Sequence, residues 1–189
     1  MYAHQLHTII RDLDAHQPCG WIVDLSDNQG GNMWPMLAGI GPILGTGIAG
    51  YFQDTEGVLT AFSYDVGQSF QGATPMTQVA KPYTLRDSDA PVAILTSKKT
   101  ASSGEAIVVA FRERPNTRSF GQPTAGLSTG NNTYTLSDGA TLVLTEVVFV
   151  DRTRTLYGQS IEPDEQPTWF GASVRDRATA WLHTQPSCQ

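Results

Sequence analysis

Residues 91–111 read PVAILTSKKTASSGEAIVVAF, and they predict the class of the fold. The apolar run at 91–96 is typical of a buried strand, and the run that follows Ser102 is typical of a helix. Ser102 and Glu105 stand at the spacing of a capping box, in which a hydroxyl accepts a backbone N–H and a glutamate reaches back to the helix start. The stretch therefore predicts a strand, a short loop and a helix.

The same residues also fit a catalytic interpretation of Ser102. Its hydroxyl would lie at a helix N-terminus, where the partial positive charge favours a developing negative charge. Gly104 leaves room for a backbone or a substrate to approach closely. Helix cap and nucleophile predict nearly the same local structure, so this segment alone leaves both alternatives open.

Outward from this stretch, strands and helices alternate along the chain. We expect helices at 3–16, 33–44, 102–113 and 171–183, and strands at 20–25, 91–96, 118–121, 132–136 and 141–150. A hairpin is expected over 46–64 with its turn near 54–57, and 65–90 reads as a polar loop that holds at most one strand. This order predicts an α/β layered fold with additional β-hairpins, formed by residues 1–189 as a single domain.

Composition argues against several kinds of partner. The net charge is −6 and the basic residues form no run, which disfavours nucleic acid and anionic membranes. No apolar run approaches the ~20 residues that span a bilayer. Cys19 and Cys188 have no metal-type spacing, and the sequence leaves open whether they pair. His4 and His7 share a helical face without a carboxylate at ligand spacing, so we expect no metal site there.

Two glycine-rich segments need separate interpretations. Residues 45–50 match G-x-G-x-x-G, but they follow a helix and lead into a strand, which is the reverse of a dinucleotide site. We therefore expect no cofactor there. Residues 28–32, NQGGN, lie between a strand and a helix, where Gly30 and Gly31 can point free N–H groups into a cavity. Together with the serine segment they would offer the donors and the hydroxyl that acyl transfer needs.

Four segments resemble, in order, the blocks of the S41 peptidases: WIVDLSDNQGGNMWPMLAG, PVAILTSKKTASSGEAIVVAF, GQPTAGLSTGN and IEPD. The resemblance implies a ClpP/crotonase-like fold and serine hydrolysis of peptide bonds. It implies Ser102 as the nucleophile, with Ser103 as the alternative, and an oxyanion hole from the N–H of Ser103 and that of Gly30 or Gly31. It also implies Glu162 as an orienting acid.

The chain departs from the family pattern at the general base. Processing proteases of the family use a lysine where this chain has Leu127, so members with the TASSGE block and a histidine base are the better comparison. In those members the histidine precedes the first matched helix. We therefore expect that this chain lacks an N-terminal segment of the full protein, and with it the base. The family loop also usually has arginine where this chain has Ser26.

The expected function is a serine peptidase that acts on a peptide or protein without a cofactor. One alternative is a crotonase-like acyl-CoA enzyme, although the acidic chain has no basic cluster for the CoA phosphates. Another is a catalytically inactive peptide-binding domain that keeps the fold. The resemblance suggests an extracytoplasmic location, while the first residues show no signal-peptide pattern. The sequence gives neither the substrate nor the oligomeric state.

Overall fold

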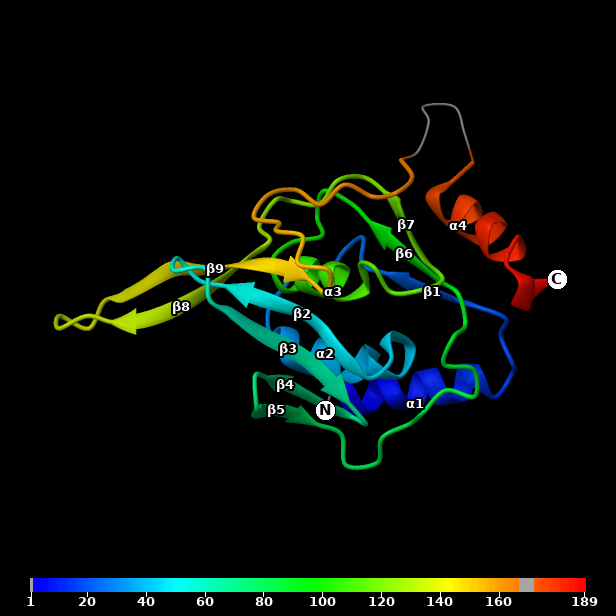
Figure 1. The fold of residues 1–189 in the computed structure, drawn as a ribbon, viewed down its shortest axis with the longest axis horizontal. Helices are drawn as coiled ribbons and strands as arrows, with labels where there is room; N and C mark the ends of the chain where they lie inside the picture. Colours follow the sequence, from blue (N-terminus) through cyan, green and yellow to red (C-terminus); the bar gives the residue numbers. More distant parts are fainter. Residues whose placement is uncertain (1, 167–171) are drawn as a thin grey trace.

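The computed structural model describes residues 2–166 and 172–189 and has two β-sheets with helices between and beside them (Figure 1). The smaller sheet is parallel, with strand order β1-β6-β7, and the larger has the order β5-β4-β3-β2-β9-β8. The α/β class with additional hairpins, predicted from the alternation of elements, is confirmed.

The parallel sheet consists of β1 (Trp21–Asp24), β6 (Val92–Thr96) and β7 (Thr117–Gly121). Every residue of β6 is buried, as expected for the central strand of a parallel sheet covered on both faces. Because β1 and β6 are neighbours and run in the same direction, the loops that follow them leave the same edge of the sheet. The sequence-based strands at 20–25 and 91–96 match these two elements.

Helices α2 (Met33–Leu44) and α3 (Ser103–Phe111) lie between the two sheets, and α1 (Tyr2–Asp14) packs beside α2. Their apolar side chains form the main core with alternate residues of β1 and β6 and three phenylalanines of the large sheet, Phe52, Phe62 and Phe149. Helix α4 (Val174–His183) covers the other face of the parallel sheet through Ala178 and Leu182. The expected start of this helix at residue 171 lies outside the described residues.

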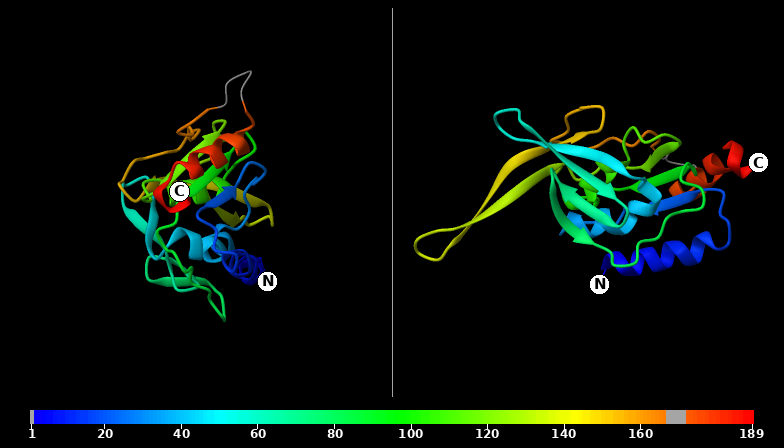
Figure 2. Two further views of the ribbon diagram at one scale, coloured as in Figure 1. Left: turned by 90° about the vertical axis from the view of Figure 1, so that its right-hand side faces the viewer. Right: turned by 60° about the horizontal axis from the view of Figure 1, so that its bottom comes forward.

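The large sheet is antiparallel and contains β2 (Gly47–Gln53), β3 (Leu59–Asp65), β8 (Thr129–Thr135) and β9 (Thr141–Asp151). The hairpin predicted at 46–64 is present as β2 and β3, with Asp54 accepting hydrogen bonds from the turn. Strands β8 and β9 form a second hairpin that projects from the body of the molecule (Figures 1 and 2).

The interpretation of 65–90 as a loop with at most one strand is wrong. Two strands form there, β4 (Gln68–Gln71) and β5 (Thr74–Gln78), and they extend the large sheet beyond β3. The buried residue of β4 is Ser69, whose hydroxyl donates to the Trp34 carbonyl and accepts from the Thr77 N–H. A strand that buries a serine lacks the apolar alternation used to recognise strands. Pro75 is tolerated because β5 is an edge strand.

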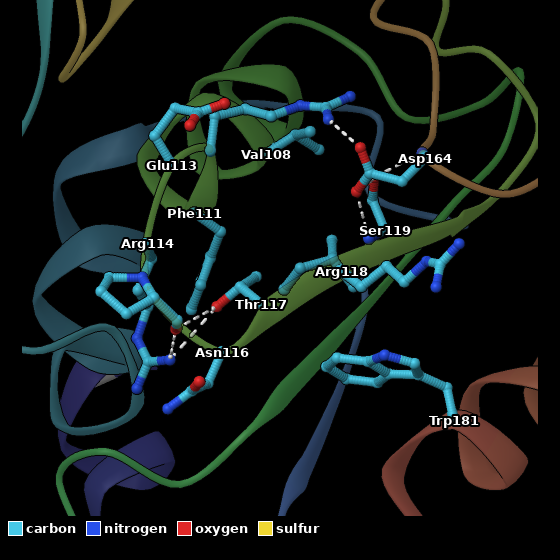
Figure 3. A pocket seen from close by; sticks show the side chains of 13 residues that line it. Val108, Phe111, Glu113, Arg114, Asn116, Thr117, Arg118, Ser119, Asp164 and Trp181 are labelled. Carbon is cyan, nitrogen blue, oxygen red and sulfur yellow. Dashed lines mark hydrogen bonds and ion pairs between the residues drawn. The ribbon is translucent and has the colours of Figure 1, made fainter. Parts of the chain in front are cut away.

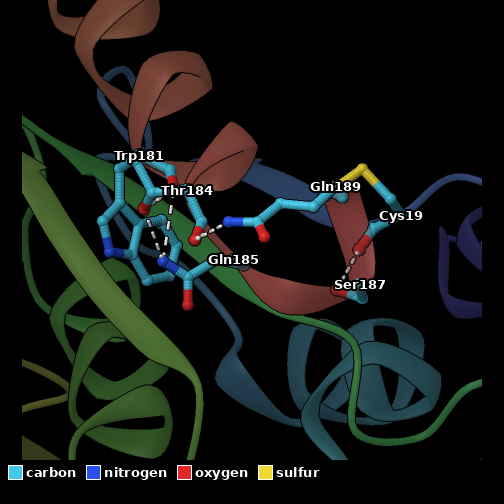
Figure 4. The surroundings of a disulfide bond; sticks show 7 residues. Cys19, Trp181, Thr184, Gln185, Ser187 and Gln189 are labelled. Carbon is cyan, nitrogen blue, oxygen red and sulfur yellow. Dashed lines mark hydrogen bonds between the residues drawn. A yellow bond between two sulfur atoms is a disulfide. The ribbon is translucent and has the colours of Figure 1, made fainter.

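A disulfide joins Cys19, just before β1, to Cys188 at the C-terminal end (Figure 4). The Ser187 hydroxyl donates to the Cys19 carbonyl at 3.0 Å, so the segment after α4 is held by a hydrogen bond as well as by the covalent link. The pairing that the sequence left open is therefore present.

Candidate active site

The loops after β1 and β6 meet and are joined by hydrogen bonds. The Ala101 N–H donates to the Asn28 carbonyl at 3.0 Å, and the Thr100 hydroxyl donates to the Leu25 carbonyl at 2.8 Å. Gly104 permits this contact, because a Cβ atom there would lie 2.4 Å from the Asn28 carbonyl oxygen. The two strand–loop–helix units predicted to share a site thus come together at one edge of the parallel sheet.

Ser102 has a strained backbone at the start of α3, with φ 52° and ψ −119°. An ordinary helix cap has extended φ and ψ, whereas positive φ at a non-glycine residue costs of order 1–3 kcal/mol and persists only where its surroundings impose it. Its N–H donates to Glu105 at 2.8 Å, which is the glutamate half of the predicted capping box. The Ser102 side chain also faces the Glu105 N–H, as in a capping box, but within the described residues its hydroxyl makes no cap hydrogen bond of normal geometry.

Ser103, the alternative nucleophile, is buried, and its hydroxyl is already engaged. It donates to the Gly31 carbonyl at 2.7 Å. As the first residue of α3, Ser103 has a backbone N–H with no partner inside the helix. The two serines therefore differ: Ser102 offers a free hydroxyl, and Ser103 offers a backbone donor beside it.

Gly30 and Gly31 both have φ values that favour glycine, +103° and +116°. A Cβ atom on Gly30 would lie 2.9 Å from both the Ala101 carbonyl oxygen and the Ser102 Cβ, so Gly30 is in contact with the serine turn. The Gly30 N–H donates to the Asn28 side chain at 3.1 Å. No described residue accepts the N–H of Gly31. Of the two candidate donors, Gly31 is the one left available.

Glu105 lies at the centre of the hydrogen bonds that hold this turn, a role that the sequence analysis did not assign. Its side chain is fully buried. It accepts the Ser102 N–H at 2.8 Å, the Thr124 hydroxyl at 2.5 Å, and the backbone N–H groups of Gly126 and Leu127 at 3.0 and 2.8 Å. One carboxylate thus ties the serine turn to the 124–127 loop. The Ser-x-x-Glu spacing was the available signal, but it was interpreted only as a cap.

A cavity of about 560 Å³ opens beside the two loops and contains Ser102, Ser103 and Gly31 in its wall. Apolar side chains make up much of the remaining wall: Met33, Trp34, Phe52, Val147 and Phe149. The cavity also reaches four consecutive residues of β8, Thr129–Asn132. A space with a hydroxyl and free N–H groups at one side and an apolar wall at the other can hold an acyl group and the side chain that accompanies it.

None of the four histidines, all within the described residues, lines this cavity. His4, His16 and His183 are exposed. His7 is buried and uses both ring nitrogens, since Nε2 donates to the Ala38 carbonyl and Nδ1 accepts the Tyr83 N–H. Burial lowers the pKa of His7 below its usual range, although the bond to Ala38 opposes this. Leu127, at the lysine position of the family, has an exposed side chain.

Glu162 lies beside Arg112, at the end of α3 that is away from Ser102, and does not line the Ser102 cavity. Its carbonyl accepts the Arg112 guanidinium, and its carboxylate accepts the Gln166 amide at 2.7 Å. The neighbouring Asp164 faces a second cavity, where it pairs with Arg112 at 2.8 Å and accepts from Ser119 (Figure 3). Glu162 and Asp164 of the IEPD block thus contact Arg112, just after the C-terminal end of α3, whereas Ser102 lies at its N-terminal end.

Within the part of the chain that the structure describes, no three His, Cys, Asp or Glu side chains gather as metal ligands would. In residues 2–166 and 172–189, no helix has the length and apolar character needed to cross a bilayer.

The sequence matches the profile of peptidase family S41 over residues 1–166. It is 31% identical over 167 residues to the nisin-resistance protein of Lactococcus lactis subsp. lactis. This match covers 88% of this chain and 50% of that protein. The structure is similar to a lipoprotein from Streptococcus agalactiae, with a TM-score of 0.73 and 30% identity, covering 97% of this chain and 60% of that one.

The photosystem II D1 C-terminal processing protease has the same fold at 20% identity, with a TM-score of 0.61, and the match covers 87% of this chain and 38% of that one. The chain spans about half the length of the nisin-resistance protein. The match to the family profile includes both glycines, both serines and the IEPD block. The chain belongs to peptidase family S41.

Proposed function

We propose that this chain is the core of a serine peptidase, with Ser102 as the nucleophile. The observation that carries the proposal is the strained Ser102 turn, whose free hydroxyl lies at the N-terminus of α3 and at the wall of the cavity. Strained φ and ψ values that the surroundings enforce are typical of functional positions. A residue that serves only as a helix cap does not need such φ and ψ values. The substrate is a peptide or protein.

In the proposed reaction the Ser102 oxygen bonds to the scissile carbonyl carbon while its proton passes to a general base. The C–N bond then breaks, and the amine leaves with that proton. Water hydrolyses the resulting acyl-enzyme. The N–H groups of Gly31 and Ser103 stabilise the negative charge on the carbonyl oxygen. We propose Gly31 rather than Gly30, because Asn28 already accepts the Gly30 N–H.

We propose that the base is a histidine from a part of the full protein that precedes this chain. None of the four histidines present lines the cavity. Glu162 as an orienting acid stays a prediction, supported by the family resemblance alone. A peptide-binding domain without catalysis is the second candidate, favoured by the lack of a base among the residues that line the cavity.

The disulfide and the relatives support a location outside the cytoplasm. Disulfides persist mainly in oxidising compartments, and Cys19 and Cys188 are bonded. One similar structure is that of a lipoprotein. We therefore propose that the protein acts in an extracytoplasmic compartment.

A fluorophosphonate probe tests the role of Ser102 in the full protein. We expect one covalent adduct, located on Ser102 by mass spectrometry, and none in Ser102→Ala. Because Ser103 is engaged with Gly31, Ser103→Ala should still be labelled. Labelling of Ser102→Ala but not of Ser103→Ala would transfer the role to Ser103. Peptide that binds to the full protein without labelling or turnover would favour the non-catalytic binding domain.

A further inference from the structure

The hairpin of β8 and β9 has an exposed stretch, residues 131–145, that we call the arm. Every residue of the arm is exposed, and the arm projects away from the two-sheet body (Figures 1 and 2). A two-stranded ribbon is marginal by itself in water. The arm therefore gains stability from whatever its exposed side chains bind.

The two faces of the arm differ in polarity. Asn132 pairs with Leu144, and Tyr134 pairs with Leu142, and residues paired across two strands point to the same side of the sheet. Glu146 is on this side as well, since it accepts hydrogen bonds from Asn132 and Tyr134. The opposite face carries mainly threonine: Thr133, Thr135, Thr141 and Thr145, with Val143 among them.

The apolar side of the arm continues the wall of the Ser102 cavity. Asn132 and Glu146, at the base of this side, both line the cavity. The register shifts at Gly130, which pairs with Val147, while Asn131 pairs with Thr145, so Glu146 is an extra residue in β9. A bulge of this kind resets the alternation of side chains along the bulged strand. Val147, which lines the cavity, and Leu144 and Leu142 of the arm therefore lie on the same face of the hairpin.

We propose that the apolar side of the arm binds an extended segment of the peptide substrate, away from the bond that is cut. The proposal rests on the proposed peptidase function of the same cavity. Tyr134, Leu142 and Leu144 are 44%, 39% and 43% exposed, which leaves apolar area for a bound chain to cover. An extended peptide presents alternate side chains to one side. The preferred substrate therefore has apolar residues at alternate positions several residues from the scissile bond.

The length of the arm sets how far this preference reaches. Each strand residue adds about 3.3 Å, so the part of the arm from Asn132 to its turn spans about the length of four extended substrate residues. A substrate that ends at the cavity cannot touch Leu142 or Tyr134. Short and long peptides should therefore differ in affinity, which a purely structural role of the arm does not predict.

Fluorescence anisotropy with two labelled peptides tests this on the present chain. The long probe has about ten residues with leucine at alternate positions, and the short probe is its central four or so residues. We expect replacement of both Leu142 and Leu144 by serine to weaken binding of the long probe about tenfold. Binding of the short probe should not change. The matched control is Val143→Ser, on the other face and 58% exposed, which should leave both affinities unchanged.

Equal affinity of the double variant and the wild type for the long probe would overturn the proposal. An equal loss for both probes, or the same loss in Val143→Ser, would also overturn it. A change of oligomeric state in the double variant, seen by sedimentation, would instead assign this face to a second copy of the chain. Binding needs no catalysis, so a failure of Ser102 labelling would reject the peptidase function while leaving this test readable.

Discussion

Glu105 shows how one buried side chain can hold a reactive turn in place. A carboxylate removed from water is costly unless donors replace the lost hydration, and here four donors do so. Three of them are backbone N–H groups, of Ser102, Gly126 and Leu127, so the side chain fixes main chain rather than other side chains. The strained conformation of Ser102 thus depends on an anchor three residues away.

We expect Glu105→Gln to impair both stability and the reactivity of Ser102. Glutamine has one acceptor oxygen and places an NH₂ group against backbone donors, which leaves buried groups unpaired at about 1–3 kcal/mol each. The free energy of unfolding, from urea titration, should fall by about 2 kcal/mol or more. The rate of fluorophosphonate labelling per folded molecule of the full protein should fall as well.

The exposed Glu113, just beyond the other end of α3, provides the matched control for this change. Glu113→Gln should alter neither stability nor labelling. If Glu105→Gln lost stability but its folded fraction were labelled at the wild-type rate, Glu105 would support only the fold.

Gly31→Ala separates the oxyanion role from the conformational one. A Cβ atom on Gly31 would meet only the Met36 Cε, at 3.9 Å, whereas one on Gly30 would clash with Ala101. Alanine keeps the N–H but disfavours φ +116°, so the peptide group should turn and move the N–H away from the oxyanion. We expect kcat in the full protein to fall about 10²–10³-fold, as it does on loss of an oxyanion donor, with a smaller effect on Tm. Activity that falls only in proportion to unfolding would show that the turn is structural. Gly30→Ala should destabilise the fold more than Gly31→Ala.

At this scale the sequence predicted which segments meet but not how they are held. Ser102, Gly30 and Gly31 were found because their residue types and positions before helices fit acyl transfer. The strain at Ser102 and the engagement of Ser103 were not predictable. The first depends on Glu105, which the 124–127 loop holds in place, and the second on the Gly31 carbonyl, 72 positions away. The four donors to Glu105 come from two loops that only the tertiary fold brings together.

At the scale of elements, α1 is attached to its neighbours through His7. Nε2 donates to α2 at the Ala38 carbonyl, and Nδ1 accepts the Tyr83 N–H. A proton on Nδ1 would face that N–H donor and break the bond. Burial, the larger effect, also disfavours the charged ring, and together with repulsion from His4 it lowers the pKa of His7.

The sign of this shift predicts a loss of stability in mild acid. The unfolded chain takes up a proton at His7 near the ordinary pKa of about 6.5, while the folded chain does so only at lower pH. The free energy of unfolding should therefore decrease as the pH falls from about 7.5 to 5.5, by at most about 1.4 kcal/mol per pH unit. Urea titrations of the wild type and His7→Gln measure it. An equal pH slope in both proteins would contradict the prediction, and the exposed His4→Gln is the control.

The bounds of helices and strands could be predicted where the local sequence is strongly apolar. Helix α2 and strand β6 lie within a residue of their expected bounds, because α2 is apolar throughout and β6 is a run of aliphatic residues that ends in threonine. Strands β4 and β5 lack such a pattern. They are strands because β4 pairs with β3 and β5 pairs with β4, not because of their own composition. The projecting length of β8 and β9 was also beyond prediction, because nothing local says what an exposed hairpin packs against.

At the scale of the whole molecule, the disulfide joins residues 169 positions apart. In the chain-entropy account, closing so long a loop destabilises the unfolded chain by about 5 kcal/mol. We expect replacement of both Cys19 and Cys188 by serine to lower the free energy of unfolding by about 2–5 kcal/mol. Reductant should lower the stability of the wild type to the same level and leave the double variant unchanged. No difference in urea midpoint between oxidised and reduced wild type would contradict this.

The same covalent link closes residues 19–188 into a ring. The tip of the arm, Ser137-Asp138-Gly139, lies inside this ring and is exposed. A single backbone cut there, by the protein itself or by another protease, would leave two fragments still joined through sulfur. The mass of the nicked molecule would increase by one water only. In denaturing gel electrophoresis its two fragments would separate only after reduction.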